Sequence, residues 1–251
     1  MRERFGARDE RSLALRFHAQ TGGSTLTAQG PLNNVVRVAL QAFAATAGGC
    51  QSLHTNGYDE ALALPTERSA TLALRTQQVL LHESGVASVP DPFGGSDYVE
   101  GLTDAIERQA RQLIAEVDER GGAVAAIESG WVKGRIEDEA FAQQRAIEQG
   151  ETVIVGVNRY ADPTDSDIEL LAVTQASEQV QIERLRAVRE GRAAAVCESA
   201  LAEVAAAARD ASRPVLEPLR SALAARCTVG EVCRALRGEW GSYDSQVSDG
   251  R

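Results

Sequence analysis

The sequence predicts an α/β protein in which strands and helices alternate first and a helical extension follows. Three observations support this prediction. A short strand, a helix and a second short strand follow one another within residues 13–54, the order of a parallel βαβ unit. The run 152–157 has the highest density of β-branched residues and is typical of a further strand. Beyond residue 168, alanine, arginine and glutamate predominate, and these residues favour helices.

The first predicted strand covers residues 13–17 and ends near the glycine pair at positions 22 and 23. A helix follows from about residue 31 to the glycines at 48 and 49, because asparagine near a start and glycine at a stop are usual helix boundaries. The second strand covers residues 50–54. Two further segments, 58–64 and 66–83, have helical spacing of apolar residues.

A loop rich in proline and glycine leads to a long predicted helix over residues 98–120. Its apolar positions form one stripe, which we interpret as a core-packing face: Leu102, Ile106, Ala110, Leu113, Ile114 and Val117. Another helix is predicted over 136–149. The acidic, proline-containing connector 161–167 then separates two predicted domains, residues 1–160 and residues 161–251.

The second domain is predicted to be helical throughout. Residues 178–189 and 193–209 are good helix formers, and prolines 214 and 218 mark the start of a helix that ends at Ala225. Thr228 and Glu231 have the spacing of a capping box, which opens a last helix. The polar tail after Trp240 is expected to fray.

Composition excludes several classes of function. The hydrophobic fraction of 43% and charged fraction of 25% are those of a globular protein, and the net charge of −10 disfavours nucleic acid and anionic membranes. The start of the chain lacks the apolar run of a signal peptide, and no segment approaches the roughly 20 apolar residues of a membrane span. The four cysteines lack metal-site spacing. We therefore expect reduced thiols, no metal and a cytoplasmic protein.

Several segments carry a resemblance to a known family: RFHAQTGGSTLTAQGPLNNVVR, GGCQSLHTNGYDEALALPTERSA, DPFGGSDYVEGLT, GGAVAAIESGW, VIVGVNRY and ARCTVGEVCRAL. In this order they resemble the catalytic large, or alpha, subunit of the methylmalonyl-CoA mutase family, whose members are adenosylcobalamin-dependent acyl-CoA mutases. The resemblance covers nearly the whole chain. It implies a radical isomerase acting on an acyl-CoA.

For the fold, the resemblance implies the C-terminal portion of a (β/α)8 TIM barrel, followed by a helical extension that leads toward a cobalamin domain. A complete barrel needs about 250 residues by itself, so this chain is expected to be a truncated, split or mis-started catalytic subunit. The cobalamin-binding motif Asp-x-His-x-x-Gly is absent. The implied partners are an N-terminal barrel fragment or full-length mutase subunit, and a cobalamin-binding small subunit or domain.

Candidate site residues lie where the two strands end. His18 and Gln20 are two apart and share a side of their strand, and the resemblance gives them the catalytic positions beside substrate and cofactor. A lone histidine would more often be structural, but the surrounding motif favours the catalytic interpretation. Gln51 is expected to face the acyl-CoA channel, and His54 and Asn56 are weaker candidates for cofactor binding.

Arg11 matches a basic position near the coenzyme's polar groups, although a lone arginine is more often a solvated charge. The substrate stays open among methylmalonyl-CoA, isobutyryl-CoA and 2-hydroxyisobutyryl-CoA. A different class of function also stays open: a non-catalytic interaction module, or inactive remnant, whose helical part docks a cobalamin-binding subunit.

Overall fold

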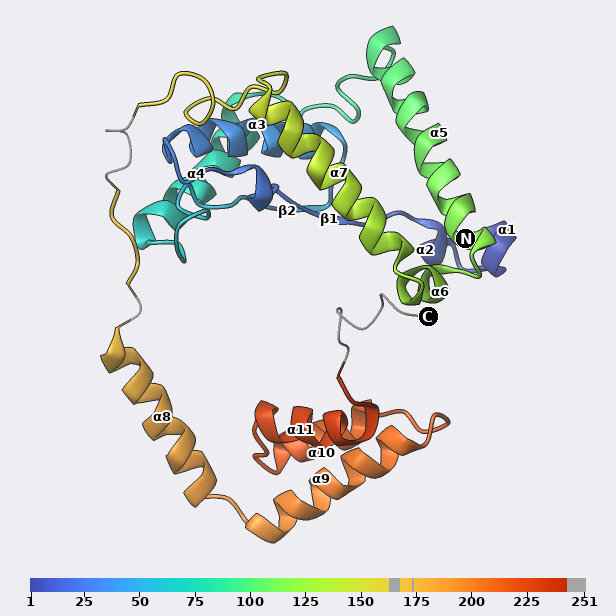
Figure 1. The fold of residues 1–251 in the computed structure, drawn as a ribbon, viewed down its shortest axis with the longest axis vertical. Helices are drawn as coiled ribbons and strands as arrows, with labels where there is room; N and C mark the ends of the chain where they lie inside the picture. Colours follow the sequence, from blue (N-terminus) through green and yellow to red (C-terminus); the bar gives the residue numbers. More distant parts are fainter. Residues whose placement is uncertain (163–167, 173, 243–251) are drawn as a thin grey trace. The chain divides into compact units, whose positions relative to one another are not determined.

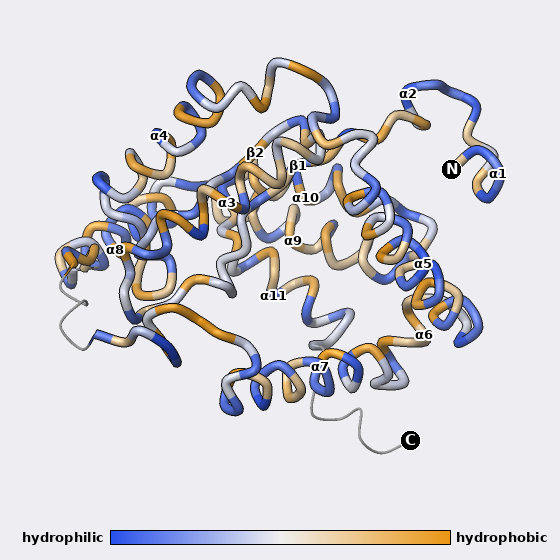
Figure 2. Tube along the Cα trace, turned by 90° about the horizontal axis from the view of Figure 1, so that it is seen from above, coloured by the Kyte–Doolittle hydropathy of each residue, from blue (hydrophilic) through white to orange (hydrophobic). Residues whose placement is uncertain are grey.

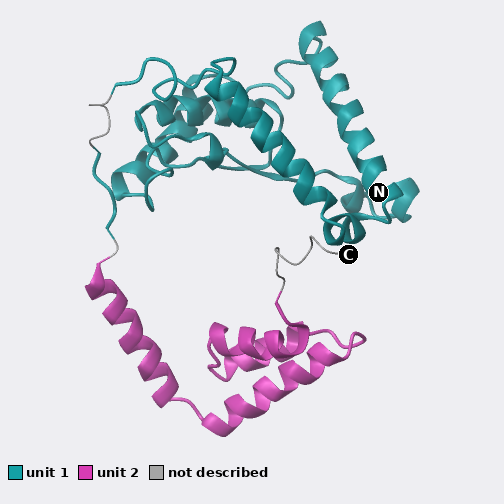
Figure 3. Cartoon of the chain, viewed as in Figure 1, with its two compact units in different colours: residues 1–172 teal, residues 173–251 magenta. Residues whose placement is uncertain are grey.

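The structure, a computed structural model, describes residues 1–162, 168–172 and 174–242. The chain divides into two compact units, residues 1–172 and 173–251 (Figure 3). Most of the connector predicted at 161–167, and most of the tail predicted to fray, lie outside the described residues. The assignment of separate roles to residues 1–160 and 161–251 stays a prediction.

The first unit is mostly helical and contains one small sheet (Figure 1). Its elements, in order, are α1 (Arg2–Phe5), α2 (Glu10–Leu13), β1 (His18–Gln20), the 3₁₀ turn η1 (Gly23–Thr25), α3 (Asn33–Ala47), β2 (Ser52–His54), α4 (Glu67–Glu83), α5 (Asp97–Glu119), α6 (Ala123–Glu128) and α7 (Trp131–Glu148). The α3 helix packs against both α4 and β2.

Strands β1 and β2 are parallel, and α3 connects them. The βαβ prediction is therefore confirmed, but the first strand is shorter and later than expected. Residues 10–13 form helix α2, because the Asp9 side chain accepts a hydrogen bond from the Arg11 backbone N–H at 2.8 Å and caps it. The strand begins only at His18. The remaining strands of a barrel are not present among the described residues.

The predicted helix over 58–64 is wrong, since these residues form turns ahead of α4. Buried Asp59 organises them: one carboxylate oxygen accepts from the Thr66 backbone N–H (3.0 Å), and the other accepts from Ser69 Oγ (2.5 Å). Thr66 caps α4 through the Ser69 backbone N–H. The helix predicted over 66–83 is confirmed, with the Asp59 carboxylate fixed at its N-terminus.

The helix predicted over 98–120 is confirmed as α5, but its apolar stripe does not pack into a core. No residue of α5 is buried in the described part of the chain. Leu102, Ile106, Leu113 and Ile114 are all exposed, Ile106 by 58%. Apolar and polar residues alternate along α5 and α7 (Figure 2). The spacing correctly predicted an amphipathic helix. The prediction that its apolar face packs into a core is wrong for the described residues.

The strand predicted over 152–157 is also wrong. This segment makes a single bridge, between Val155 and Arg159. The Asn158 side chain supplies the hydrogen bonds that a neighbouring strand would give: it donates to the carbonyls of Ile147 (2.9 Å) and Thr152 (2.8 Å) and accepts from the Ile154 N–H (2.7 Å). A local side chain has replaced the sheet.

The second unit contains α8 (Gln175–Glu190), α9 (Ala194–Arg209), α10 (Leu216–Ala224) and α11 (Val229–Trp240), as the sequence predicted. The last three pack on one another around a small apolar core: Cys197, Val204, Ala222, Cys227 and Val232. The capping box of Thr228 and Glu231 is confirmed. Among the described residues, no helix is long and apolar enough to cross a membrane.

Candidate functional site

The candidate site is one face of the two-stranded sheet, which reaches the carboxyl ends of both strands at Gln20 and His54. The parallel register sets His18 beside Ser52 and Gln20 beside His54. Because side chains alternate along a strand and register partners share a face, these four side chains point the same way. All four are exposed, whereas Ala19 and Leu53 on the opposite face are partly buried.

Two hydrogen bonds orient the predicted catalytic pair. The Nδ1 atom of His18 lies 2.6 Å from Ser52 Oγ, and Gln20 Nε2 donates to Asn56 Oδ1 at 3.1 Å. His18 and Gln20 are thus each held by a residue of the segment 52–56. Ser52 was not identified from the sequence as the hydrogen-bond partner of His18. A parallel pairing of residues 18–20 with residues 52–54 would have placed the two side by side.

Asn56 is the most constrained residue of the site. It is 2% exposed, and its backbone N–H donates to Thr21 Oγ1 at 2.9 Å. Its Nδ2 group has no hydrogen-bond partner among the described residues. A Cβ atom at Gly23 would lie 3.0 Å from this nitrogen, so the glycine allows the loop to approach the amide closely. A buried donor without a partner is costly, which makes this amide a fitting contact for a ligand oxygen.

The loops behind the site are held by other buried polar side chains. Asn34 Nδ2 donates to the carbonyls of Thr27 and Tyr58, at 2.9 Å each, and so ties the loop after β1 to the loop after β2. Thr55 Oγ1 donates to the Ala73 carbonyl of α4 at 2.8 Å. These bonds fix both strand ends, as a binding site on loops requires.

Gly57 is the point of closest packing in this scaffold. A Cβ atom there would lie 2.5 Å from Asp59 Oδ1 and would also collide with Ser69 Oγ. Any side chain at this position would separate the Asp59 carboxylate from α4. The glycine therefore serves close approach between the loop and the helix.

Gln51 and Arg11 do not join the face formed by His18 and Gln20. Gln51 precedes β2, where its Oε1 accepts from the Phe17 N–H (2.7 Å) and its Nε2 donates to the Gly49 carbonyl (2.8 Å). By alternation it belongs to the side of Leu53. Arg11 is exposed on α2. Their predicted contacts with substrate stay predictions, and Gln51 has a structural task in holding β1 to β2.

An open groove of about 880 Å³ adjoins the loop that follows β1. Its walls come from α3, α7 and residues 152–155. Gln41, on α3, connects groove and loop, because its Oε1 accepts from the Gly22 N–H and its Nε2 donates to Thr25 Oγ1. A molecule in the groove would therefore contact the same loop that borders the site.

The face offers polar hydrogen-bonding groups and no carboxylate: two imidazoles, an amide and a hydroxyl. It has no carboxylate pair for acid–base work among the side chains just described. The described residues also contain no cluster of three or more His, Cys, Asp or Glu suited to a metal ion. Such a face can bind and orient an oxygen-bearing ligand through hydrogen bonds.

Comparison with known proteins gives a consistent result. The profile of the family described as methylmalonyl-CoA mutase matches residues 1–242. The 2-hydroxyisobutanoyl-CoA mutase large subunit of Aquincola tertiaricarbonis is 43% identical over 97% of this chain and 43% of its own length. The methylmalonyl-CoA mutase large subunit of Streptomyces virginiae is 44% identical over 98% and 34%, respectively, and the human mitochondrial methylmalonyl-CoA mutase is 43% identical over 97% and 33%. The chain thus spans between a third and under half of these relatives.

Proposed function

Because the chain belongs to the methylmalonyl-CoA mutase family, we propose that it is part of the catalytic subunit of an adenosylcobalamin-dependent acyl-CoA mutase. The observation that carries this proposal is the face of His18, Gln20, Ser52 and His54, backed by the unpartnered Asn56 amide. It extends to the carboxyl ends of two parallel strands at Gln20 and His54, and α/β barrel enzymes bind their substrates at the carboxyl ends of their strands.

We infer that β1, α3 and β2 are one repeat of a larger (β/α)8 barrel. A parallel sheet is normally covered on both faces and continues beyond two strands. Beside this sheet, Leu15 is 79% exposed and Phe17 is exposed as well. Further strands would cover these residues, so the remaining barrel comes from the rest of a longer polypeptide or from a partner chain.

The site fits adenosylcobalamin in part. Its hydrogen-bond donors suit the hydroxyl-bearing adenosyl group, and the unpartnered amide of Asn56 would be a donor for such an oxygen, with His54 as a second candidate. The sequence has no Asp-x-His-x-x-Gly motif, so the corrin must be held by another domain or subunit. When bound, the cofactor supplies the radical by homolysis of its carbon–cobalt bond.

The chain's own residues position the substrate. His18, oriented by Ser52, would donate from its free ring nitrogen to the acyl-CoA carbonyl, which requires the tautomer with Nδ1 accepting from Ser52 Oγ. Gln20, held by Asn56, would cover the reacting carbon and exclude water. Positioning of this kind raises the rate without any nucleophile or metal from this chain.

The test is mutase turnover in a reconstituted mixture of this chain, an upstream barrel fragment of a relative, a cobalamin-binding subunit and adenosylcobalamin. Methylmalonyl-CoA, isobutyryl-CoA and 2-hydroxyisobutyryl-CoA are compared as substrates. We expect turnover of one of them in the complete mixture only. His18→Ala should lower kcat by about 100-fold, and Gln20→Ala by about 10-fold.

The matched controls are His82→Ala on α4 and Gln112→Ala on α5, since both side chains are exposed and lie on helices outside the sheet. They should leave kcat unchanged. If His18→Ala and Gln20→Ala also leave turnover unchanged while the mixture still assembles, the catalytic assignment is wrong.

One observation favours the alternative of an interaction module. Helices α9, α10 and α11 pack around a core of their own, to which no residue of the candidate site contributes. In that case the second unit would bind the cobalamin subunit and the first would be inactive. Assembly measured by analytical ultracentrifugation, with no turnover of any of the three substrates, would favour this function.

A further inference from the structure

The core of the second unit contains two cysteines that the proposed function does not use. Cys197 lies in the first turns of α9 and is 2% exposed, and Cys227 lies in the turn before α11 and is 5% exposed. They are 30 positions apart in the sequence. Both are free thiols in this structure.

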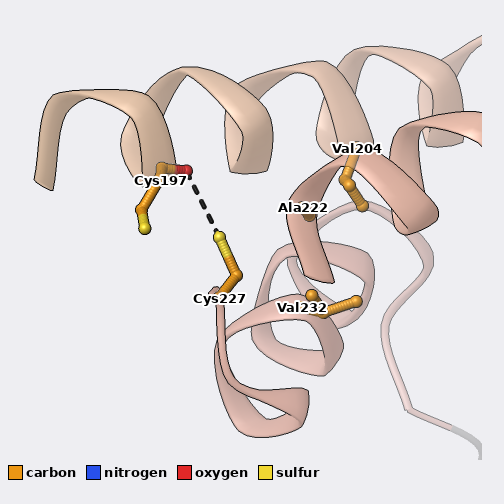
Figure 4. Packing of buried hydrophobic residues seen from close by; sticks show 5 residues of the cluster. All are labelled: Cys197, Val204, Ala222, Cys227 and Val232. Atoms are coloured by element: carbon orange, nitrogen blue, oxygen red, sulfur yellow. Dashed lines mark hydrogen bonds between the residues drawn. The ribbon is translucent and has the colours of Figure 1, made fainter. Parts of the chain in front are cut away.

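Each thiol lies against a backbone carbonyl at or near the other cysteine, and Figure 4 shows the contact of Cys227 with the Cys197 carbonyl. Cys227 Sγ donates to the Cys197 carbonyl at 3.6 Å, and Cys197 Sγ donates to the Ala225 carbonyl, two residues before Cys227, at 2.9 Å. Each thiol therefore contacts the backbone that carries the other. A disulfide needs its two cysteine backbones to approach closely in this way, and here the fold alone brings them together.

We propose that Cys197 and Cys227 form a reversible dithiol–disulfide pair, a modification site for peroxide that ties α9 to the turn between α10 and α11. The bond would close a loop that contains all of α10. Closing a loop of this length restricts the unfolded chain and stabilises the folded one.

The chemistry balances with hydrogen peroxide as the oxidant. One thiol is oxidised to a sulfenic acid, while peroxide is reduced and leaves as water. The second thiol then attacks the sulfenic sulfur, the S–S bond forms, and the sulfenic oxygen leaves as a second water with both remaining protons. A dithiol such as dithiothreitol reverses the reaction by thiol–disulfide exchange.

Burial makes the reaction slow but selective. Burial raises the pKa of the Cys227 thiol, and the neighbouring Cys197 thiol raises it further, so the reactive thiolate is scarce. Oxidation must then follow local opening of this unit. Cys233, which is exposed on α11, should be oxidised or alkylated first. Once Cys197 or Cys227 is oxidised, the other thiol of the pair is close enough to react with it.

The experiment uses the full chain with both other cysteines replaced, Cys50→Ser and Cys233→Ser. The second replacement is needed because trypsin leaves Cys227 and Cys233 on one peptide, residues 227–234. The chain is treated with hydrogen peroxide in 0 M and about 1 M urea, a concentration below that of most unfolding midpoints. It is then alkylated, digested and analysed by mass spectrometry. We expect peptide 193–209 linked to peptide 227–234, two hydrogens lighter than their sum, and formed faster in urea.

Thermal unfolding of the same chain in a Trp131→Phe background, followed by the fluorescence of Trp240, gives an independent result. The linked chain should unfold about 10 °C higher than the reduced chain, and dithiothreitol should abolish the difference. Cys227→Ala and Cys197→Ala, confirmed as folded by circular dichroism, should show neither linked peptide nor shift.

The proposal is overturned if peroxide leaves both thiols unlinked in urea, or converts Cys197 to a sulfinic acid without a link. It is also overturned if the linked chain unfolds at the same temperature as the reduced one. None of these outcomes depends on mutase activity, so they leave the proposed function untouched.

Discussion

The two units bury different kinds of groups. The first unit buries polar side chains around the ends of its two strands, namely Thr21, Asn34, Thr55, Asn56, Asp59 and Ser69, and leaves large apolar residues exposed on several helices. In α9, α10 and α11 of the second unit the core is apolar apart from two thiols, although Leu216 and Val229 are exposed there too. Buried polar side chains hold the strand ends of the first unit, whereas apolar packing holds the three helices of the second together. Each unit contains one tryptophan, Trp131 or Trp240, so fluorescence can follow them separately.

The largest loss of stability is expected when the buried polar hydrogen bonds of the first unit are removed. Asp59→Ala removes the acceptor of the Thr66 N–H and of Ser69 Oγ, and should lower the free energy of unfolding by about 3 to 5 kcal/mol, since two buried donors lose a charged acceptor. The measurement is urea unfolding in a Trp240→Phe background. Asp59→Asn keeps one acceptor and should lose about half as much. An equal loss in both variants would contradict the assigned role of the two bonds.

The second prediction concerns the apolar core. Val204→Ala removes two buried methyl groups from α9 and should cost about 2 to 3 kcal/mol, from lost burial and the cavity that remains. Unfolding is followed by Trp240 in a Trp131→Phe background. The matched control is Val196→Ala, because Val196 is exposed on the same helix. If Val204→Ala also lowers the stability reported by Trp131 in a Trp240→Phe background, the two units do not unfold independently.

The third prediction uses the ion pair at the edge of the second unit. Arg192 binds both carboxylate oxygens of Glu231 at 2.6 Å, and this contact, with the Thr228 backbone N–H, holds the pKa of Glu231 well below its usual value. The folded state therefore binds a proton less readily than the unfolded state. The stabilisation should be complete above about pH 5 and should decrease as the pH falls through the usual carboxyl value of about 4.3.

Glu231→Gln tests this dependence. The variant should lower the Tm of the second unit by a few degrees at pH 7 and should lose less stability than the natural chain between pH 6 and pH 3. Thermal scans across this range check both points. Parallel curves for the two proteins would mean that Glu231 does not carry the effect.

The smallest effect on stability is expected for a substitution on α5. It also tests most directly whether the exposed apolar residues of the first unit bind a partner. Ile106→Ser changes an exposed residue and should alter the free energy of unfolding of this chain by less than about 0.5 kcal/mol. The same substitution should weaken assembly with an upstream barrel fragment, measured by sedimentation. Gln112→Ala, on the same helix, is the control. Unchanged assembly would show that the apolar face of α5 is not covered by that fragment.

Local patterns predicted most helices because their signals are local. Thr66 and Thr228 begin their helices where the sequence indicated, and the order strand, helix, strand was readable from the glycines and the apolar spacing. The errors arose where a distant or unexpected side chain took part. Asp59 holds residues 58–64 in turns, and Asn158 replaces a neighbouring strand for residues 152–157. Neither effect has a signature in a short window.

The candidate site was partly predictable for the same reason. His18 and Gln20 share a face because of strand alternation, which a sequence contains directly. The link from Gln20 to Asn56 depends on the parallel register and on the turn at Thr21. The double hydrogen bond of Gln51 to the Phe17 and Gly49 backbones required the fold. The exposure of the α5 stripe could not be predicted, because spacing reveals an apolar face but not what covers it.

The ion pair of Arg192 also determines where a protease can cut. Trypsin must draw an arginine side chain into its own specificity pocket, and the Arg192 side chain is held by Glu231 with 15% exposure. Arg189, one turn earlier at the end of α8, lies 3.9 Å from the same carboxylate but is 50% exposed. Brief digestion should therefore trim α8 at Arg189 and spare the bond after Arg192, and the bundle of α9, α10 and α11 would remain as a resistant fragment.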